Sequence, residues 1–154
     1  MPDATSTQTP DPNPHPVAAS RPLLTEGRVR EVTGEQMVFQ LPGTDYRLHL
    51  LLSGGGAKPA VGSKLRGRIA VDAQRMDLIP AGGTYIEPVF GRPRRLQGRV
   101  VGVDDTRGTA RLLVSAGGAV FACTLTDRRQ SPADFPIGHL VSFDVERGAR
   151  FEPM

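Results

Sequence analysis

Apolar and polar residues alternate along most of the chain from Leu23 onward, the pattern of a β-strand that buries one face. Residues 46–52 are apolar at every second position, and residues 65–73 repeat this arrangement with an interruption at Gly67. No long window keeps apolar residues at the spacing of a helical face. The chain is therefore predicted to be all-β.

Turn-forming residues separate the predicted strands. Residues 42–45, Pro-Gly-Thr-Asp, can join a strand at 36–41 to one at 46–52, and Arg147-Gly148 can close a tight hairpin. The glycine and proline content is high, at 18 and 14 residues of 154. Much of it falls where the strands need turns.

Parts of the pattern occur twice in the same order, which indicates an internal duplication. Each match keeps its apolar face, and the offset between the copies grows from 71 to 76 residues, as loop insertions would make it. The matched segments are 26–29 with 97–100, 46–50 with 121–125, 61–62 with 137–138, and 65–73 with 141–149.

Each copy is predicted to hold a three-stranded meander, a loop and two further strands. So short a sheet is stable only if it closes, because closure buries the apolar face and removes the edges. This strand plan is similar to that of OB-fold and SH3-like small barrels. We expect two tandem five-stranded antiparallel barrels related by duplication, at 23–80 and 95–154, with a linker at 81–94.

The first 22 residues contain six prolines with mostly small or polar residues between them. Such a segment buries too little apolar surface to offset the entropy of ordering, so 1–22 is predicted to be a disordered tail. It lacks the features of a secretory signal, and no apolar run is long enough to span a membrane. The single cysteine, Cys123, excludes an internal disulfide. We expect a cytoplasmic protein without membrane association.

Residues that could carry out catalysis or bind a metal are scattered. The histidines, His15, His49 and His139, lie at no metal-ligand spacing from one another or from Cys123. There is no Gly-x-Ser-x-Gly elbow, and the glycine-rich residues 53–59 lack the Walker spacing and precede a strand. We predict no enzymatic activity, no catalytic residue, no metal site and no cofactor.

Positive charge is concentrated where the two copies join. The formal net charge of the chain is +3, and residues 81–99 carry the same net charge. Aromatic residues beside a positive groove are typical of proteins that bind single-stranded nucleic acid without sequence preference. The predicted binding residues are Arg92, Arg94, Arg95, Arg99, Tyr85 and Phe90.

The same segment has a structural interpretation. Tyr85, Ile86, Val89 and Phe90 would then pack between the barrels, and the arginines would pair with acids of the two copies. The two interpretations are compatible, because a packed linker can still present arginines to solvent.

A second class of ligand follows from a resemblance. PilZ domains, small barrels that bind cyclic dinucleotides, carry Arg-x-x-x-Arg at the start of the barrel and a later Asp/Asn-x-Ser-x-x-Gly. Arg95 and Arg99 have the first spacing, and residues 115–118 match Ser-x-x-Gly, with Leu113 at the Asp/Asn position. The resemblance implies a cyclic-dinucleotide sensor.

We predict a non-enzymatic binding module whose partner is single-stranded nucleic acid or another polyanion, bound at the arginine and aromatic surface of the linker. The first alternative is a protein-interaction or structural module with an unidentified protein partner and no nucleic-acid role. The second is the PilZ-like sensor.

Overall fold

The computed structural model describes residues 23–53 and 57–154, so the tail predicted at 1–22 lies outside the described residues. The all-β prediction is confirmed. No helix in the described part is long and apolar enough to cross a membrane. The strands are β1 (Thr25–Thr33), β2 (Gln36–Gln40), β3 (Arg47–Leu52), β4 (Lys64–Ala73), β5 (Asp77–Ile79), β6 (Tyr85–Glu87), β7 (Phe90–Gly91), β8 (Arg95–Asp104), β9 (Arg111–Ala116), β10 (Ala119–Leu125), β11 (Leu140–Asp144) and β12 (Arg150–Pro153), with a short 3-10 helix η1 (Pro132–Asp134) before β11.

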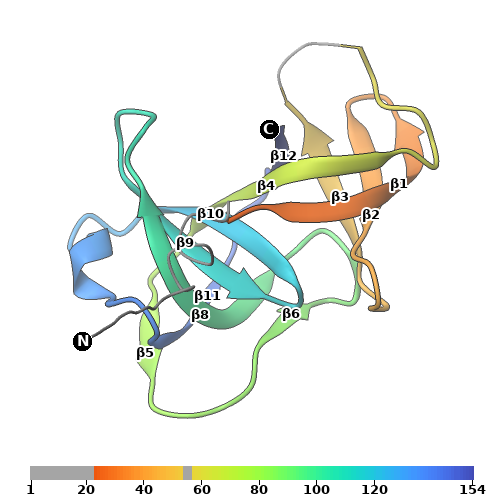
Figure 1. Ribbon diagram of the computed structural model, residues 1–154. Coiled ribbons are helices and arrows are strands. Elements are labelled where there is room, and N and C mark those ends of the chain that lie inside the picture. Colours follow the sequence, from red (N-terminus) through yellow and green to blue (C-terminus); the bar gives the residue numbers. More distant parts are fainter. Residues whose placement is uncertain (1–22, 54–56) are drawn as a thin grey trace, which may run out of the picture.

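The strands close two small barrels that lie side by side (Figure 1). In the first barrel the order is β1, β2, β3, β12 and β4, and β4 pairs again with β1. In the second barrel β8, β9 and β10 are followed by the C-terminal half of β4. A bridge from Ala73 to Val145 leads on to β11, which pairs with β8.

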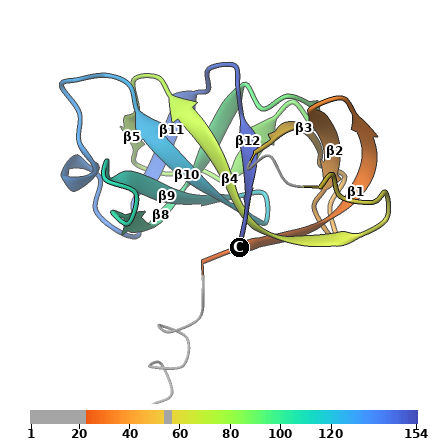
Figure 2. The same ribbon diagram turned by 90° about the horizontal axis from the view of Figure 1, so that it is seen from above.

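Each barrel takes one strand segment from the other half of the chain. β4 pairs with β1 through its first residues and with β10 of the second barrel through residues 69–73. In return, the C-terminal strand β12 pairs with β3 and β4 of the first barrel. Figure 2 shows β4 and β12 crossing at the centre of the molecule, where the two barrels meet.

This exchange corrects two expectations. The barrels are not purely antiparallel, because β12 with β3, β10 with β4 and β7 with β3 are parallel pairs. Arg147-Gly148 does not close a hairpin, because β11 and β12 pair with different strands. The alternation of apolar residues reports which face is buried, but it does not report which strand is the neighbour.

The duplication is visible in equivalent backbone hydrogen bonds. In the first copy Val29 makes two such bonds with the loop at 62–63, and in the second copy Val100 makes the same two with the loop at 138–139. Each loop turns at its first residue, a glycine with a φ of 90° in the first copy and 93° in the second. β1 and β8 also bulge immediately after these valines.

The strand ladders change one of the repeat matches. When the cross-strand pairs are followed from the bulge of each copy to its third strand, Leu48 of β3 is equivalent to Phe121 of β10 and not to Cys123. A slip of two residues leaves every side chain on its own face, so the alternation in the sequence could not detect it.

One continuous apolar core fills both barrels. Phe151 of β12 packs inside the first barrel against Phe39, with ring centroids 4.9 Å apart, so the exchanged strand contributes to the core as well as to the sheet. Cys123 is fully buried in this core, where burial raises the pKa of its thiol. The thiol therefore stays protonated, as expected for a core cysteine.

A buried cluster of ion pairs fastens the exchanged strand. Asp104, at the end of β8, accepts hydrogen bonds from Arg111 at 2.9 Å and from Arg68 of β4 at 3.0 Å. Arg111 also donates to Glu152 of β12 at 3.0 Å, and Arg107 lies 3.5 Å from the same carboxylate. The cluster therefore connects the hairpin of β8 and β9 to both crossing strands.

Candidate functional site

The structure divides the six predicted binding residues between two faces. Tyr85, Arg95 and Arg99 lie on the outer face of the second barrel, where the side chains of β8 alternate between buried and solvent-facing. Phe90, Arg92 and Arg94 lie beside the outer face of the first barrel, because β7 pairs with β3.

The residues on the second barrel have partners within the protein. Arg95 donates to Asp144 at 2.8 Å and to Ser142 at 2.7 Å. The hydrogen bond to Asp144, and then the interaction with Tyr85, raise the pKa of the Arg95 guanidinium. Tyr85 lies at 3.5 Å from a side-chain oxygen of Gln97, its neighbour across the strand pair.

Arg99 holds the loop before β11, since it donates to the carbonyl of Gly138 at 3.1 Å. The equivalent residue of the first copy, Arg28, makes the same contact with Gly62 at 3.0 Å. The arginine of the repeated Gly-Arg-Val segment thus has the same structural contact in both copies.

Arg92 and Arg94 line a groove with a volume of about 500 Å³, and Phe90 lies beside it, against His49 of its lining. The groove runs between β3, the segment 91–94 and the turn that leads into β12. Its lining includes three arginines, Arg92, Arg94 and Arg147, and an apolar part formed by Leu50, Leu51 and Ala149. We refer to it as the arginine groove.

Local backbone structure brings the first two arginines to the groove. Gly91 has a φ of 137°, a value that favours glycine, and Pro93 is buried beneath the segment. The backbone of Arg94 is fixed at both ends, because its N–H donates to Glu87 at 2.8 Å and its carbonyl accepts from Val145 at 2.8 Å. Arg92 and Arg94 therefore flank a buried proline on a fixed segment.

Arg147 reaches the groove through the strand exchange. It lies in the turn between β11 and β12, and the carbonyl of Ala149 accepts a hydrogen bond from Leu51 of β3 at 2.9 Å. This contact seats the turn against the first barrel. Residues about one hundred positions apart in the sequence are thus brought to one groove.

The three arginines of the groove repel one another. The pKa of Arg92 is lowered by its partial burial and then by the positive charges of Arg147 and Arg94. Within residues 23–53 and 57–154 none of the three guanidinium groups has an ion pair or a side-chain hydrogen bond, and no acid lines the groove. Concentrated positive charge of this kind is suited to an anion.

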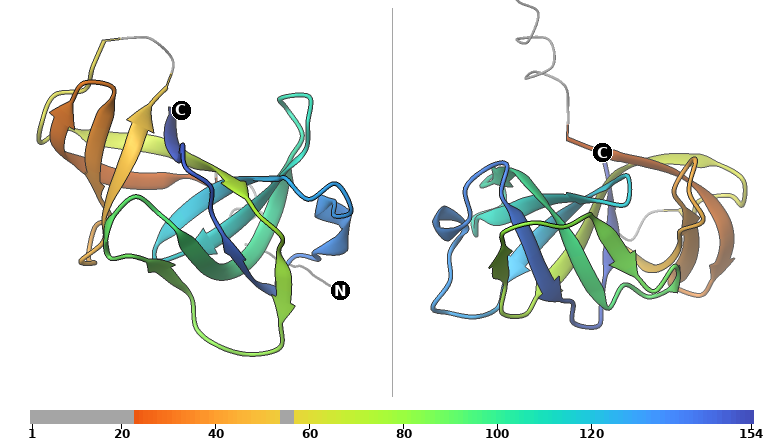
Figure 3. Two further views of the ribbon diagram at one scale, coloured as in Figure 1. Left: turned by 180° about the vertical axis from the view of Figure 1, so that it is seen from behind. Right: turned by 90° about the horizontal axis from the view of Figure 1, so that it is seen from below.

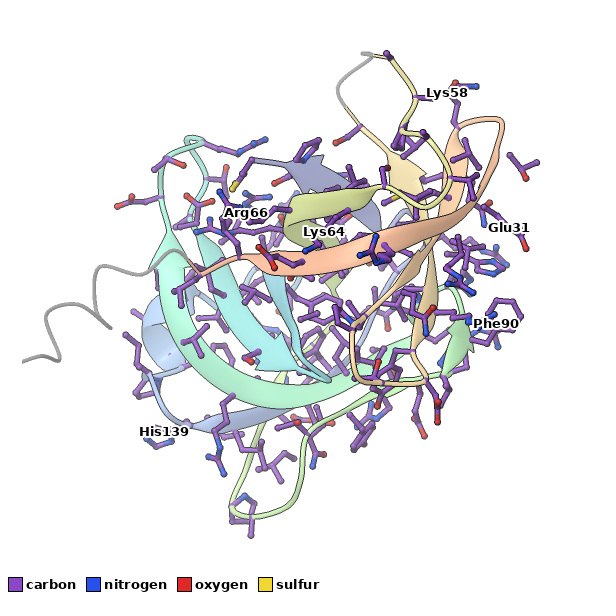
Figure 4. All side chains as sticks on the ribbon, turned by 45° about the vertical axis from the view of Figure 1, so that its right-hand side comes forward. Glu31, Lys58, Lys64, Arg66, Phe90 and His139 are labelled. Atoms are coloured by element: carbon purple, nitrogen blue, oxygen red, sulfur yellow. The ribbon has the colours of Figure 1, made fainter. Side chains whose placement is uncertain are left out.

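Two rings complete the site. His49 lies on the outer face of β3 and lines the groove, and its Nε2 atom is buried with no hydrogen-bond partner in the described part of the chain. The ring of Phe90 meets the His49 ring edge-to-face, with centroids 5.1 Å apart. Figure 4 shows Phe90 at the periphery of the molecule, on the side away from His139.

The sequence did not identify Arg147 or His49 as site residues. From the sequence, Arg147 was interpreted as a turn residue. His49 was interpreted as an outward side chain without a metal-ligand partner. The outward position of His49 was a usable signal, but nothing in the sequence placed the two side by side. Among the residues described, no group of three or more His, Cys, Asp or Glu side chains is placed to hold a metal ion.

Comparison with known proteins gives little further information. No protein-family model matches the chain, and no curated protein does. Among solved structures, the molybdate-bound crystal structure of the cytoplasmic molybdate-binding protein ModG is similar at a TM-score of 0.40 and 17% identity, over 84% of this chain and 93% of that one. A similarity at this level carries no inference about ligand or activity.

Proposed function

We propose that this protein is a non-enzymatic module that binds a phosphate-bearing polyanion, such as nucleic acid, in the arginine groove. The observation that carries the proposal is the convergence of Arg92, Arg94 and Arg147 in a groove with no acid among the described residues that line it. Arginine binds phosphate with two parallel hydrogen bonds, so three of them favour a ligand with more than one negative charge.

The other arginines of residues 81–99 support this choice of groove by contrast. Arg95 is held by Asp144 and Ser142, and Arg99 by the carbonyl of Gly138. A ligand would have to compete with those contacts. In the arginine groove the ligand instead relieves the repulsion among the guanidinium groups, which lowers the free energy of the complex.

The experiment measures binding of a labelled abasic oligonucleotide, which carries the phosphates without the bases, by fluorescence anisotropy at several salt concentrations. The wild-type protein is expected to bind at low salt, with an affinity that falls as salt rises. Changing Arg92 and Arg94 together to alanine should flatten the slope of log affinity against log salt by about 1.4, since each contact with a single-strand phosphate contributes about 0.7.

A double change of Arg95 and Arg99 to alanine is the matched control, because it removes the same charge from outside the arginine groove. It should leave the slope nearly unchanged. If both double variants flatten the slope of log affinity against log salt equally, only the overall charge attracts the ligand, which contradicts the proposal. If the wild-type protein does not bind even at the lowest salt, the proposal is rejected in favour of a protein-interaction module.

A further inference from the structure

We infer that the polyanion is a single-stranded nucleic acid and that one of its bases stacks on Phe90. The inference rests on the proposed function, since the phosphates must occupy the arginine groove. Its basis is the position of Phe90 beside that groove, with an exposed ring, Arg47 level with it on the neighbouring strand and Arg92 two residues further along.

Phe90 is exposed to an extent that folding does not explain. Its residue surface is 61% accessible, and no other Phe or Tyr in the described ranges is classed as exposed. An aromatic ring left in water gives up the free energy that burial would provide, so its exposure is accounted for when a ligand covers it. Every nucleic-acid base presents a flat face that can do so.

The ring is held in position before any ligand arrives. Phe90 is opposite Arg47 in the parallel pair of β7 with β3, and the backbone N–H of Arg47 donates to Val89 at 2.9 Å. The edge-to-face contact with His49 fixes the ring from the side. Because the ring is already ordered, stacking a base on it costs little further side-chain entropy.

One basic group lies level with the ring on the neighbouring strand, and another lies further along the strand direction. Arg47 is level with Phe90, while Arg92 follows Gly91, which is level with Leu48. Arg47 and Arg92 are therefore about two residues apart along the strands, roughly 7 Å. Arg47 is exposed and has no ion pair or side-chain hydrogen bond among the residues described.

This spacing suits successive phosphates of an extended strand. One phosphate would lie in the arginine groove and the next at Arg47, and the base of the nucleotide at Arg47 would reach Phe90, which is level with it. In a duplex the bases are already stacked on their neighbours, and the faces of all but the terminal bases are not available to a side chain. The site therefore favours a single strand.

The test compares three labelled probes of equal length: oligothymidylate, the abasic strand and a duplex that contains the thymidylate strand. Wild-type protein is expected to bind oligothymidylate between about 5-fold and about 150-fold more tightly than the abasic strand, since stacking on an aromatic side chain contributes about 1–3 kcal/mol per base. The duplex should show no such gain over the abasic strand.

The variant Phe90→Leu keeps an apolar side chain but removes the ring. It should reduce the affinity for oligothymidylate to that for the abasic strand, and leave the affinity for the abasic strand unchanged. Val89→Ala is the matched control, because Val89 is the exposed neighbour and has no ring. A melting curve for each variant verifies that it is folded.

The outcomes separate the two proposals. If the abasic strand binds and oligothymidylate binds no better, or if the preference survives Phe90→Leu, the inference of a stacked base is overturned and the phosphate-binding function stands. If neither single-stranded probe binds, both proposals fail.

Discussion

Replacing Asp104 with alanine is expected to lower the free energy of unfolding by about 3–5 kcal/mol, because the change removes one of the two carboxylates that neutralise the buried Arg111 and also the partner of Arg68. The side chain of Asp104 is 3% exposed and that of Arg111 is 6% exposed. Their contact of 2.9 Å belongs to the cluster that fastens β4 and β12 between the barrels. The measurement is urea unfolding of both proteins at neutral pH.

The neighbouring carboxylate provides the control for this change. Asp105 is exposed, so Asp105→Ala should change the free energy of unfolding by no more than about 0.5 kcal/mol. A similar small effect for Asp104→Ala would mean that the cluster does not stabilise the strand exchange.

The contribution of Asp104 also depends on pH, in a direction that its surroundings determine. Hydrogen bonds from Thr106, and then the contacts with Arg111, lower the pKa of the Asp104 carboxyl well below its usual range. A lowered pKa in the folded state gives stability that is present above the unfolded pKa, about 3.9, and lost as the pH falls through the folded value. The difference between wild type and Asp104→Ala should therefore shrink when the pH is lowered below about 4.

Gly67→Ala is expected to lower the free energy of unfolding by about 3 kcal/mol or more, or to prevent folding. β4 and β12 cross at this residue so closely that a Cβ atom on Gly67 would overlap with the backbone carbonyl of Glu152. Because Glu152 belongs to β12, which is paired with β4, its carbonyl cannot move without breaking this strand pairing. Figure 3 shows β12 passing between the barrels beside β4. Thermal and urea unfolding measure the loss.

Gly83 offers the matched control for this substitution. A Cβ atom on Gly83 would have no neighbour within 4 Å, and the residue is exposed. Gly83→Ala should therefore change the stability by no more than about 0.5 kcal/mol. If Gly67→Ala is equally mild, the two strands do not cross as tightly as the structure indicates.

The candidate site was predictable in part. The charge of residues 81–99 and the aromatic residues within it pointed to Arg92 and Arg94, which line the arginine groove, and to Phe90, which contacts His49 beside it. The same pattern selected Tyr85 and Arg95, because sequence does not reveal that Arg95 faces Asp144 across the pair of β8 with β11. Whether an arginine is paired or free depends on which acids the fold brings near it.

The amino-acid sequence was enough to predict the all-β class, the buried faces of the strands and the existence of two related copies. Alternation and turn residues are sufficient for the first two, since they reflect the conformation of residues close in the chain, and the repeated Gly-Arg-Val segment is sufficient for the third, since a duplication is visible as similarity between the two halves. The three-dimensional fold was needed to show that β4 and β12 lie together between the barrels and that Arg147 joins Arg92 at the groove. Strand pairing follows from the closure of the whole sheet, and two partners with the same apolar pattern are equivalent until the complete core is packed.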